Sequence, residues 1–123
     1  MEKQKYAAIV LAAGSGKRMN SQVHKQYLII QDRPVLYYSL KAFEDSAVDE
    51  IVLVVGKGEE EFCRKEIVDK YGISKVKAIV EGGKERYHSV FEGLKQTSDA
   101  DYVLIHDGAR PFVNQEIIRR CML

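Results

Sequence analysis

The chain has 123 residues, and 18 aspartates and glutamates nearly balance its 19 lysines and arginines, which leaves a formal net charge of +1. Hydrophobic residues make up 46% of the sequence and charged residues 30%, a composition that is typical of one folded domain and excludes a disordered chain. The balanced charge argues against a nucleic-acid binder that depends on a basic surface.

Nothing in the sequence indicates a membrane-spanning or secreted protein. The longest apolar run covers residues 6–13, far short of the roughly 20 residues that span a bilayer. No small-residue cleavage site follows this run, so no signal peptide is expected. The two cysteines, Cys63 and Cys121, lack the spacing of a metal site, and we expect reduced thiols in a cytoplasmic protein.

Apolar stretches rich in β-branched residues alternate along the chain with segments of helical period. In chain order, the sequence predicts a strand over 6–11, a helix around Leu36–Phe43, a strand over 50–55, a helix around Cys63–Tyr71, a strand over 76–80, a helix around Tyr87–Leu94, a strand over 102–106 and a helix around Ile117–Met122 with Asn114 as its N-cap.

Nearly continuous apolar strands are typical of a parallel sheet that is buried on both faces. Four strand–helix units in succession therefore predict an α/β fold, a three-layer sandwich with a mainly parallel sheet and right-handed crossovers. Ligands of such sheets bind beyond the carboxyl ends of the strands. We therefore expect the loops 12–25, 56–60, 81–86 and 107–111 to meet at one edge of the sheet.

Local signals add detail to three of the predicted helices. Gly72 suits the end of the second helix, since glycine readily takes the left-handed conformation there. The acidic residues 59–61 are predicted to form the first turn of that helix, where carboxylates favour the helix dipole. Tyr87, Phe91 and Leu94 share one face of the third helix and are interpreted as core residues.

The loop after the first strand carries small residues and cations, so two familiar phosphate-binding motifs can be tested on it. The dinucleotide motif G-x-G-x-x-G requires a third glycine where this chain has Met19. The P-loop motif requires glycine at Leu11 and a hydroxyl residue at Arg18. Both motifs are therefore excluded. A turn of small residues followed by Lys17, Arg18 and Lys25 remains, which indicates an anion site or, alternatively, a solvated basic loop.

Three segments of the chain resemble one family of enzymes, the cytidylyltransferases that act on 2-C-methyl-D-erythritol 4-phosphate. Residues 12–19 with Lys25-Gln26-Tyr27 are similar to the nucleotide loop of that family. Residues 82–94 look like its cytosine-binding stretch, and residues 103–111 look like its metal and substrate segment. The segments occur in the family's order over nearly the whole chain. The resemblance implies a Rossmann-like nucleotidyltransferase fold, which agrees with the pattern of strands and helices.

The resemblance implies a reaction that transfers the cytidylyl group of CTP to 2-C-methyl-D-erythritol 4-phosphate and releases pyrophosphate, a step of isoprenoid precursor synthesis by the non-mevalonate route. The attacking phosphate is already an anion, because the second pKa of a phosphate monoester is about 6. No general base is therefore required. Two polyanions must instead be brought together, which calls for cations and Mg²⁺ at the reacting phosphate.

By the same resemblance, Arg18 and Lys25 are the catalytic cations, Asp107 is the Mg²⁺ ligand and Arg110 binds the substrate phosphate. The implied nucleotide-binding residues are Ala12, Ala13, Gly14, Gly16, Gly82, Gly83 and Ser89. Plainer interpretations stay open: an Asx turn or helix cap for Asp107, an ordinary turn for the glycine pair and a surface ion pair for Arg110. His106 is interpreted as a structural residue.

The chain departs from the family pattern at His24, where proline is usual, and at Gly108, where alanine is usual. Members of the family are roughly twice as long, so residues 1–123 are expected to be the CTP-binding nucleotidyltransferase domain in truncated form. The full-length protein is expected to be a homodimer. Two alternatives remain at this point, a ribitol 5-phosphate cytidylyltransferase and a non-catalytic fragment that binds CTP.

Overall fold

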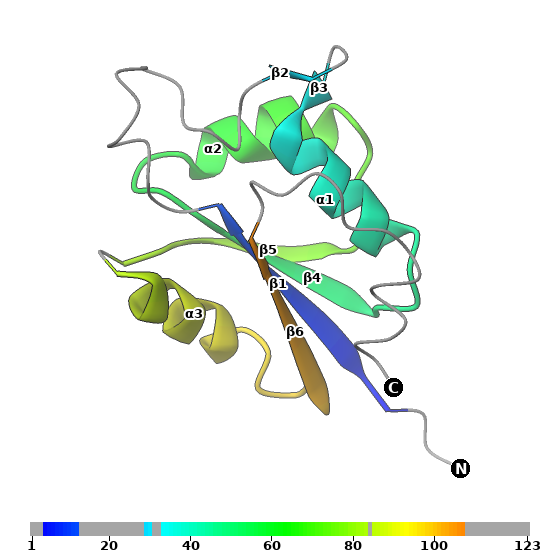
Figure 1. The fold of residues 1–123 in the computed structure, drawn as a ribbon, viewed down its shortest axis with the longest axis vertical. Helices are drawn as coiled ribbons and strands as arrows, with labels where there is room; N and C mark the ends of the chain where they lie inside the picture. Colours follow the sequence, from blue (N-terminus) through cyan, green and yellow to red (C-terminus); the bar gives the residue numbers. More distant parts are fainter. Residues whose placement is uncertain (1–3, 13–28, 31–32, 84, 108–123) are drawn as a thin grey trace.

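The computed structural model describes residues 4–12, 29–30, 33–83 and 85–107 of the chain. Its elements follow one another in the order shown in Figure 1. They are β1 (Tyr6–Ala12), β2 (Ile29–Ile30), β3 (Arg33–Pro34), α1 (Val35–Glu44), β4 (Glu50–Val55), α2 (Glu60–Cys63), the π-helical segment η2 (Arg64–Asp69), β5 (Val76–Glu81), α3 (Arg86–Lys95) and β6 (Tyr102–Asp107).

The four long strands form one sheet in the order β5-β4-β1-β6, and every neighbouring pair is parallel. The four strands predicted from the sequence are therefore confirmed, as is the α/β fold with a parallel sheet. The short antiparallel pair of β2 and β3 was not predicted. The fourth predicted helix, around Ile117–Met122, lies outside the described residues.

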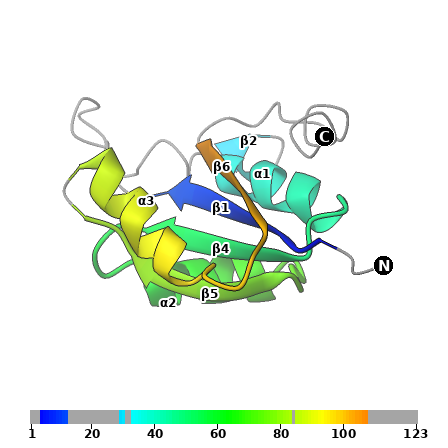
Figure 2. The ribbon, with the colours of Figure 1, turned by 90° about the horizontal axis from the view of Figure 1, so that it is seen from below.

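Helices cover the two faces of the sheet unequally (Figures 1 and 2). On one face, α1, α2 and η2 bury the larger core cluster, in which Leu36, Leu40 and Ile67 are fully buried. On the other face, α3 is the one helix among the described residues, and it contributes Val90 to a smaller cluster around Ile9. Alternate residues of each central strand enter the two clusters, so the described part of the chain forms the three layers that were predicted.

The local predictions for the second helix are confirmed for Gly72 and for two of the three acidic residues, while Glu59 is the N-cap. Glu60 and Glu61 lie in the first turn of α2, where their charges favour the helix dipole. Cys63 and Ile67 point into the core, and the helix continues through η2 with wider π-type turns. Gly72 has a φ of 66°, the left-handed conformation that glycine adopts without a steric penalty, and it ends the helical segment.

Three large side chains of α3 were interpreted as core residues, and this interpretation is wrong. Tyr87, Phe91 and Leu94 are 68%, 57% and 42% exposed. The helix instead turns Ser89 and Gly93 toward the sheet, and both are buried. A Cβ at Gly93 would lie 2.8 Å from Ile9 Cγ2, so the missing side chain is what lets α3 sit this close to β1. Small residues, rather than large ones, mark the buried face.

A network of ion pairs joins the elements at the amino edge of the sheet. Lys5 Nζ lies 2.6 Å from a carboxylate oxygen of Asp99 and 3.5 Å from Glu50, which is 8% exposed. Lys77 reaches the same two carboxylates at 3.5 and 3.4 Å. The hydrogen bond to Asp99 is the main cause that raises the pKa of Lys5; desolvation opposes it, and the attraction of Glu50 adds to the rise. The network ties β1, β4, β5 and the chain before β6 together.

Candidate functional site

The carboxyl ends of the four strands meet at the edge of the sheet opposite that network. In the strand register, Ala12 pairs with Val55, Val55 pairs with Glu81, and Leu11 pairs with Asp107. Parallel strands carry their last residues, and the loops that follow, to a common edge. The described beginnings of these loops therefore lie together, as the sequence predicted.

Ala12 and Asp107 lie at the ends of neighbouring strands and differ in exposure. Ala12, the last residue of β1, is 2% exposed, and its methyl side chain takes up little space at this edge. Asp107 is exposed. Within the described residues, no group of three or more His, Cys, Asp or Glu side chains could hold a metal ion. A hard cation at Asp107 would therefore take its other ligands from a bound phosphate, from water or from other parts of the protein.

The glycine pair after β5 has a structural role that the sequence did not indicate. The Gly82 N–H donates to the Val55 carbonyl over 2.8 Å, which extends the pairing beyond the strand. A Cβ on Gly83 would lie 2.2 Å from His88 Cβ, a distance that real contacts do not allow. Glycine at position 83 is therefore required by the close approach of the chain to α3, whether or not a ligand binds there.

The start of α3 is held by a reciprocal capping box between Glu85 and His88. The His88 N–H donates to the Glu85 side chain, and the Glu85 N–H donates to His88 Nδ1 over 3.3 Å. Two N–H groups at the helix start are thereby satisfied. The sequence signal was the spacing Glu-x-x-His, with histidine in place of the usual Glu or Gln. Because the cap fixes the loop, Gly82 and Gly83 have a defined position beside the carboxyl edge.

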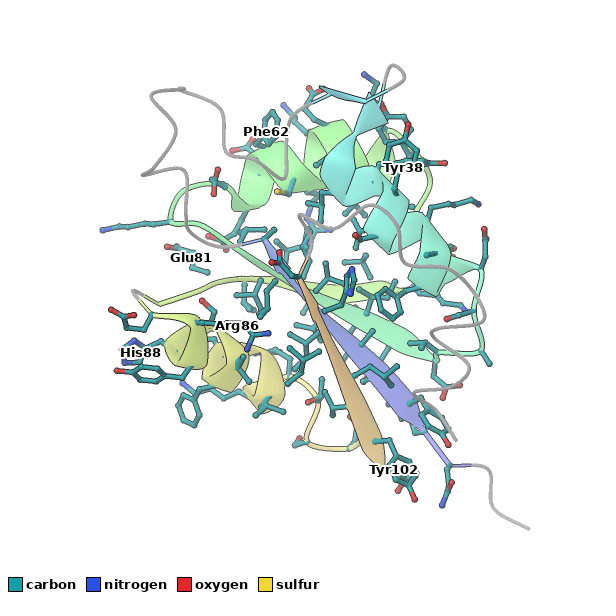
Figure 3. The ribbon with its side chains drawn as sticks, in the orientation of Figure 1. Tyr38, Phe62, Glu81, Arg86, His88 and Tyr102 are labelled. Atoms are coloured by element: carbon teal, nitrogen blue, oxygen red, sulfur yellow. The ribbon has the colours of Figure 1, made fainter. Side chains whose placement is uncertain are left out.

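Ser89 and Arg86 come from the same helix and differ in accessibility. Ser89 is 4% exposed, on the side of α3 that faces the sheet. Arg86, the first residue of α3, is exposed and lies on the lower helix in Figure 3. Of the predicted cytosine-binding set, Gly82 and Gly83 are thus the more accessible members, and a role for Ser89 stays a prediction. Arg86 adds a cation beside them.

A pair of carboxyl groups at this edge was missed by the sequence analysis. A hydrogen bond to Glu81, with some desolvation, raises the pKa of Glu60. A hydrogen bond between two carboxyl groups requires a proton on one of them, so this contact favours the protonated form of Glu60. Glu81 ends β5 and Glu60 begins α2. Their distance in sequence gives no periodic signal, and only the parallel pairing of the strands brings them together.

His106 packs on the face of the sheet that α1 covers, which supports its interpretation as a structural residue. Its Nε2 atom lies 3.4 Å from the hydroxyl oxygen of Ser39, and its ring meets Phe43 edge-on with centroids 5.5 Å apart. Both partners belong to α1. His106 therefore holds the end of β6 against α1, one residue before Asp107.

Six of the predicted site residues lie outside the described residues. They are Ala13, Gly14, Gly16, Arg18, Lys25 and Arg110. The five that the structure describes all belong to the carboxyl edge or to the first turns of the helix beside it: Ala12, Gly82, Gly83, Ser89 and Asp107.

Comparison with known proteins identifies the family. The sequence profile of the 2-C-methyl-D-erythritol 4-phosphate cytidylyltransferases matches residues 6–123. The chain belongs to that family. A curated member from Lachnoclostridium phytofermentans is 56% identical over 115 residues, which cover 94% of this chain and 49% of the relative. A member from Clostridium kluyveri is 55% identical over 112 residues and covers 90% of this chain and 48% of the relative.

Solved structures agree with the family and with its fold. The 4-diphosphocytidyl-2C-methyl-D-erythritol synthase of Anaerococcus prevotii matches with a TM-score of 0.78 at 34% identity, over 97% of this chain and 49% of that chain. The Mycobacterium tuberculosis protein Rv0371c, solved in complex with manganese, matches with a TM-score of 0.73 at 22% identity, over 97% of this chain and 58% of that chain, and shares the fold. The predicted Rossmann-like nucleotidyltransferase fold is confirmed.

This chain spans about half the length of the curated family members that it matches. The match therefore covers the amino-terminal portion of the family, with the three motif segments in it. Among the described helices, none is long and apolar enough to cross a membrane.

Proposed function

We propose that the full-length protein containing this sequence transfers the cytidylyl group of CTP to 2-C-methyl-D-erythritol 4-phosphate and releases pyrophosphate. The observation that carries the proposal is the meeting of Ala12, Gly82 and Asp107 at the carboxyl edge. Each belongs to a different motif segment of a chain in this family. A parallel sheet binds its ligand at this edge.

In the proposed reaction, a phosphate oxygen of the acceptor attacks the α-phosphorus of CTP, and the bond to the pyrophosphate oxygen breaks. The attacking oxygen is already ionised near neutral pH, so the residues need to neutralise charge rather than remove a proton. Arg18 and Lys25 supply positive charge around the α-phosphate, where charge grows as the bond forms. Arg110 binds the phosphate of the acceptor.

Asp107 fits the binding of a divalent cation, for which we propose Mg²⁺. Its carboxylate is an exposed hard oxygen ligand at a strand end, the donor type that Mg²⁺ prefers. When bound, the ion would draw negative charge from the phosphates of CTP. Mg²⁺ commonly binds through one or two carboxylates together with substrate phosphates, so the Asp107 carboxylate could hold the ion together with the phosphates of CTP.

Recognition of cytosine is assigned to small residues and to backbone groups. Gly82 and Gly83 present backbone close to the edge, and the cap on α3 fixes their position. Ala12, with Ala13, Gly14 and Gly16 of the loop that follows it, would let a flat base and its phosphates approach the chain. Ser89 would add a hydroxyl group, which requires access to its buried side of α3. We also propose that the full-length protein works as a cytoplasmic homodimer.

The test is a transfer assay on the full-length protein, followed by chromatography of the nucleotide products. CTP, UTP, ATP and GTP are compared, each with methylerythritol phosphate and with ribitol 5-phosphate, with Mg²⁺ or with a chelator. Of these combinations, we expect turnover only with CTP and methylerythritol phosphate in the presence of Mg²⁺. A chelator should abolish this turnover. Preference for ribitol 5-phosphate would replace the acceptor in the proposal. CTP binding without turnover would show a non-catalytic binding protein, and equal rates with all four nucleotides would overturn the cytosine site.

A further inference from the structure

His88, the third residue of α3, contacts the loop from β5 at two points. Its Nδ1 atom accepts a hydrogen bond from the Glu85 N–H over 3.3 Å. Its side chain also lies against Gly83, because a Cβ at position 83 would meet His88 Cβ at 2.2 Å, Cγ at 3.0 Å and Nδ1 at 3.4 Å. In Figure 3, His88 lies at the end of α3 where the chain arrives from β5. One side chain of the helix therefore contacts both Gly83 and the N-cap residue.

The glycine pair, Gly82 and Gly83, needs contacts of this kind to keep one position. Glycine loses more conformational freedom on folding than any other residue, so two glycines in a row do not fix the path of the chain by themselves. Gly82 is fixed toward β4, where its N–H donates to the Val55 carbonyl over 2.8 Å. The contacts with His88 fix the chain toward α3. The glycine pair is therefore held between a strand on one side and the His88 side chain on the other.

His88 differs from the residues assigned to the chemical step. Its Nδ1 atom bonds to the backbone of its own loop, and its ring lies against the ring of Tyr87, with centroids 4.3 Å apart. The cations assigned to the α-phosphate, Arg18 and Lys25, belong to a different segment of the sequence. We therefore expect His88 to act through the position of the glycine pair and not on the reacting phosphorus.

We propose that His88 is a positioning residue that sets the affinity and the selectivity for the cytosine base by holding Gly82 and Gly83 in place. The proposal rests on the proposed function, in which the backbone of this glycine pair binds cytosine. Cytosine and uracil differ in the hydrogen-bond donors and acceptors on one edge, and backbone groups at fixed positions reject the base that leaves them unpaired. A segment that can move relieves this mismatch. Loss of the His88 contacts should therefore weaken CTP binding and reduce discrimination against UTP.

Three substitutions in the full-length protein separate the hydrogen-bond acceptor of His88 from its ring. His88→Gln keeps an acceptor at the third position of the helix, where glutamine is a usual capping-box residue, and removes the ring. His88→Phe keeps a ring against Tyr87 and removes the acceptor. His88→Ala removes both. All three variants keep the Cβ atom that lies beside Gly83, so this part of the contact is the same in each.

Steady-state kinetics with CTP and with UTP measure the effect of each variant. We expect His88→Ala and His88→Phe to raise KM for CTP about tenfold, the size of one lost hydrogen bond, and to lower the CTP-to-UTP ratio of kcat/KM by about threefold or more. Their kcat should change by less than about threefold, because the groups around the phosphorus stay in place. His88→Gln should stay near the wild type. A wild-type KM in His88→Phe, or a KM in His88→Gln as high as in His88→Ala, would overturn the proposal.

Glu92→Gln is the control for a general loss of stability in α3. It removes the ion pair of Glu92 with Lys95, whose atoms lie 3.1 Å apart on the same helix, and has no part in the contacts of His88. Its KM for CTP and its CTP-to-UTP ratio should equal those of the wild type. A rise of KM in Glu92→Gln as large as in His88→Ala would overturn the proposal, because it would show that any weakening of α3 has this effect.

Millisecond hydrogen exchange of the peptide that contains Glu85 gives a readout that needs no turnover. We expect its amides to exchange about tenfold faster in His88→Ala and His88→Phe than in the wild type and His88→Gln, because the acceptor of the Glu85 N–H is lost. Unchanged exchange in His88→Ala would overturn the proposal. A wild-type protein without CTP turnover would instead overturn the proposed function and the link to base selection, while the exchange rates would still decide whether His88 holds the glycine pair.

Discussion

The two edges of the sheet differ in what their charged residues do. At the amino edge, Lys5, Lys77 and Asp99 surround Glu50, and the charges pair with one another across four strands or their flanks. At the carboxyl edge, Asp107 lies exposed. Ion pairs within the protein act mainly on stability, whereas a carboxylate at the ligand-binding edge of a parallel sheet lies where a cation can reach it. We therefore expect substitutions at the amino edge to change stability and substitutions at the carboxyl edge to change activity.

The largest expected effect concerns the two cations assigned to the carboxyl edge. Arg18→Ala and Lys25→Ala in the full-length protein should each lower kcat on the order of 10²–10³, as the loss of an oxyanion donor does. The thermal midpoint should hardly change. The double variant should lose less than the product of the single losses, because both cations serve one phosphorus. Arg18→Lys should restore only part of the rate, since lysine lacks the planar fork of arginine.

Steady-state kinetics and thermal unfolding would measure both quantities, with Lys65→Ala as the control. Lys65 lies on η2, and its side chain is 71% exposed. A normal kcat with a raised KM for CTP in either cation variant would contradict the catalytic role of that residue, because it would show uniform binding rather than transition-state stabilisation.

The second prediction separates two neighbours on β6. Asp107→Asn should lower turnover by on the order of tenfold or more and raise the Mg²⁺ concentration needed for half-maximal rate, because a neutral amide binds the ion less well. His106→Ala should instead lower stability by about 1–3 kcal/mol through lost packing against Ser39 and Phe43. Metal titrations and urea unfolding of both variants would check this. A change in the Mg²⁺ requirement of His106→Ala alone would reverse the assignment.

The third prediction concerns the amino edge. Glu50→Gln should destabilise the protein by about 1–2 kcal/mol, because Lys5 and Lys77 lose a nearly buried partner. Its kcat and KM should stay normal. The control Glu61→Gln removes an exposed ion pair to Lys65, whose atoms are 3.9 Å apart, and should change stability by less than about 0.5 kcal/mol. Equal stability of the two variants in urea would mean that the network at the amino edge contributes nothing.

The smallest effect is a dependence of stability on pH at the end of α1. Burial alone would raise the pKa of Glu44, but donors from Ser74 and the backbone of Lys75 outweigh it and hold the pKa below its usual range. A lowered pKa means that the folded state favours the ionised carboxylate. Its contribution is therefore complete at neutral pH and is lost as the pH falls through the lowered pKa.

Urea midpoints between pH 3 and pH 6 would test this contribution, in the range where carboxylates titrate. Glu44→Gln should show a shallower loss of stability on acidification than the wild type does. Glu61→Gln, the same change at an exposed position, should follow the wild-type curve. Parallel curves for all three proteins would show that Glu44 does not contribute.

The four strands of the sheet were predicted correctly, because nearly continuous apolar segments such as β4 are typical of strands that are buried on both faces. The prediction failed on α3, where Tyr87 and Phe91 have the period of a core face but Gly93 marks the face that is buried. Periodicity shows that one side of a helix is apolar and does not show which neighbour covers it. Among the described residues, none buries that side of α3.

For the candidate site, the motif spacing placed Ala12, Gly82 and Asp107 at one edge, since parallel strands carry their loops there. The contact of Gly83 with His88 and the pairing of Glu60 with Glu81 could not be foreseen. The first depends on how closely the loop approaches α3, and the second joins residues of α2 and β5 that are 21 positions apart. No local sequence pattern records either contact.

The strand order β5-β4-β1-β6 also bears on synthesis at the ribosome. The first strand to emerge, β1, is central in the sheet, and one of its partners, β6, is made nearly one hundred residues later. Until then β1 can pair only with β4, and its other edge offers unpaired backbone groups to neighbouring chains. Closing so long a loop is slow, so the nascent chain is expected to depend on chaperones until residues 102–107 have left the exit tunnel.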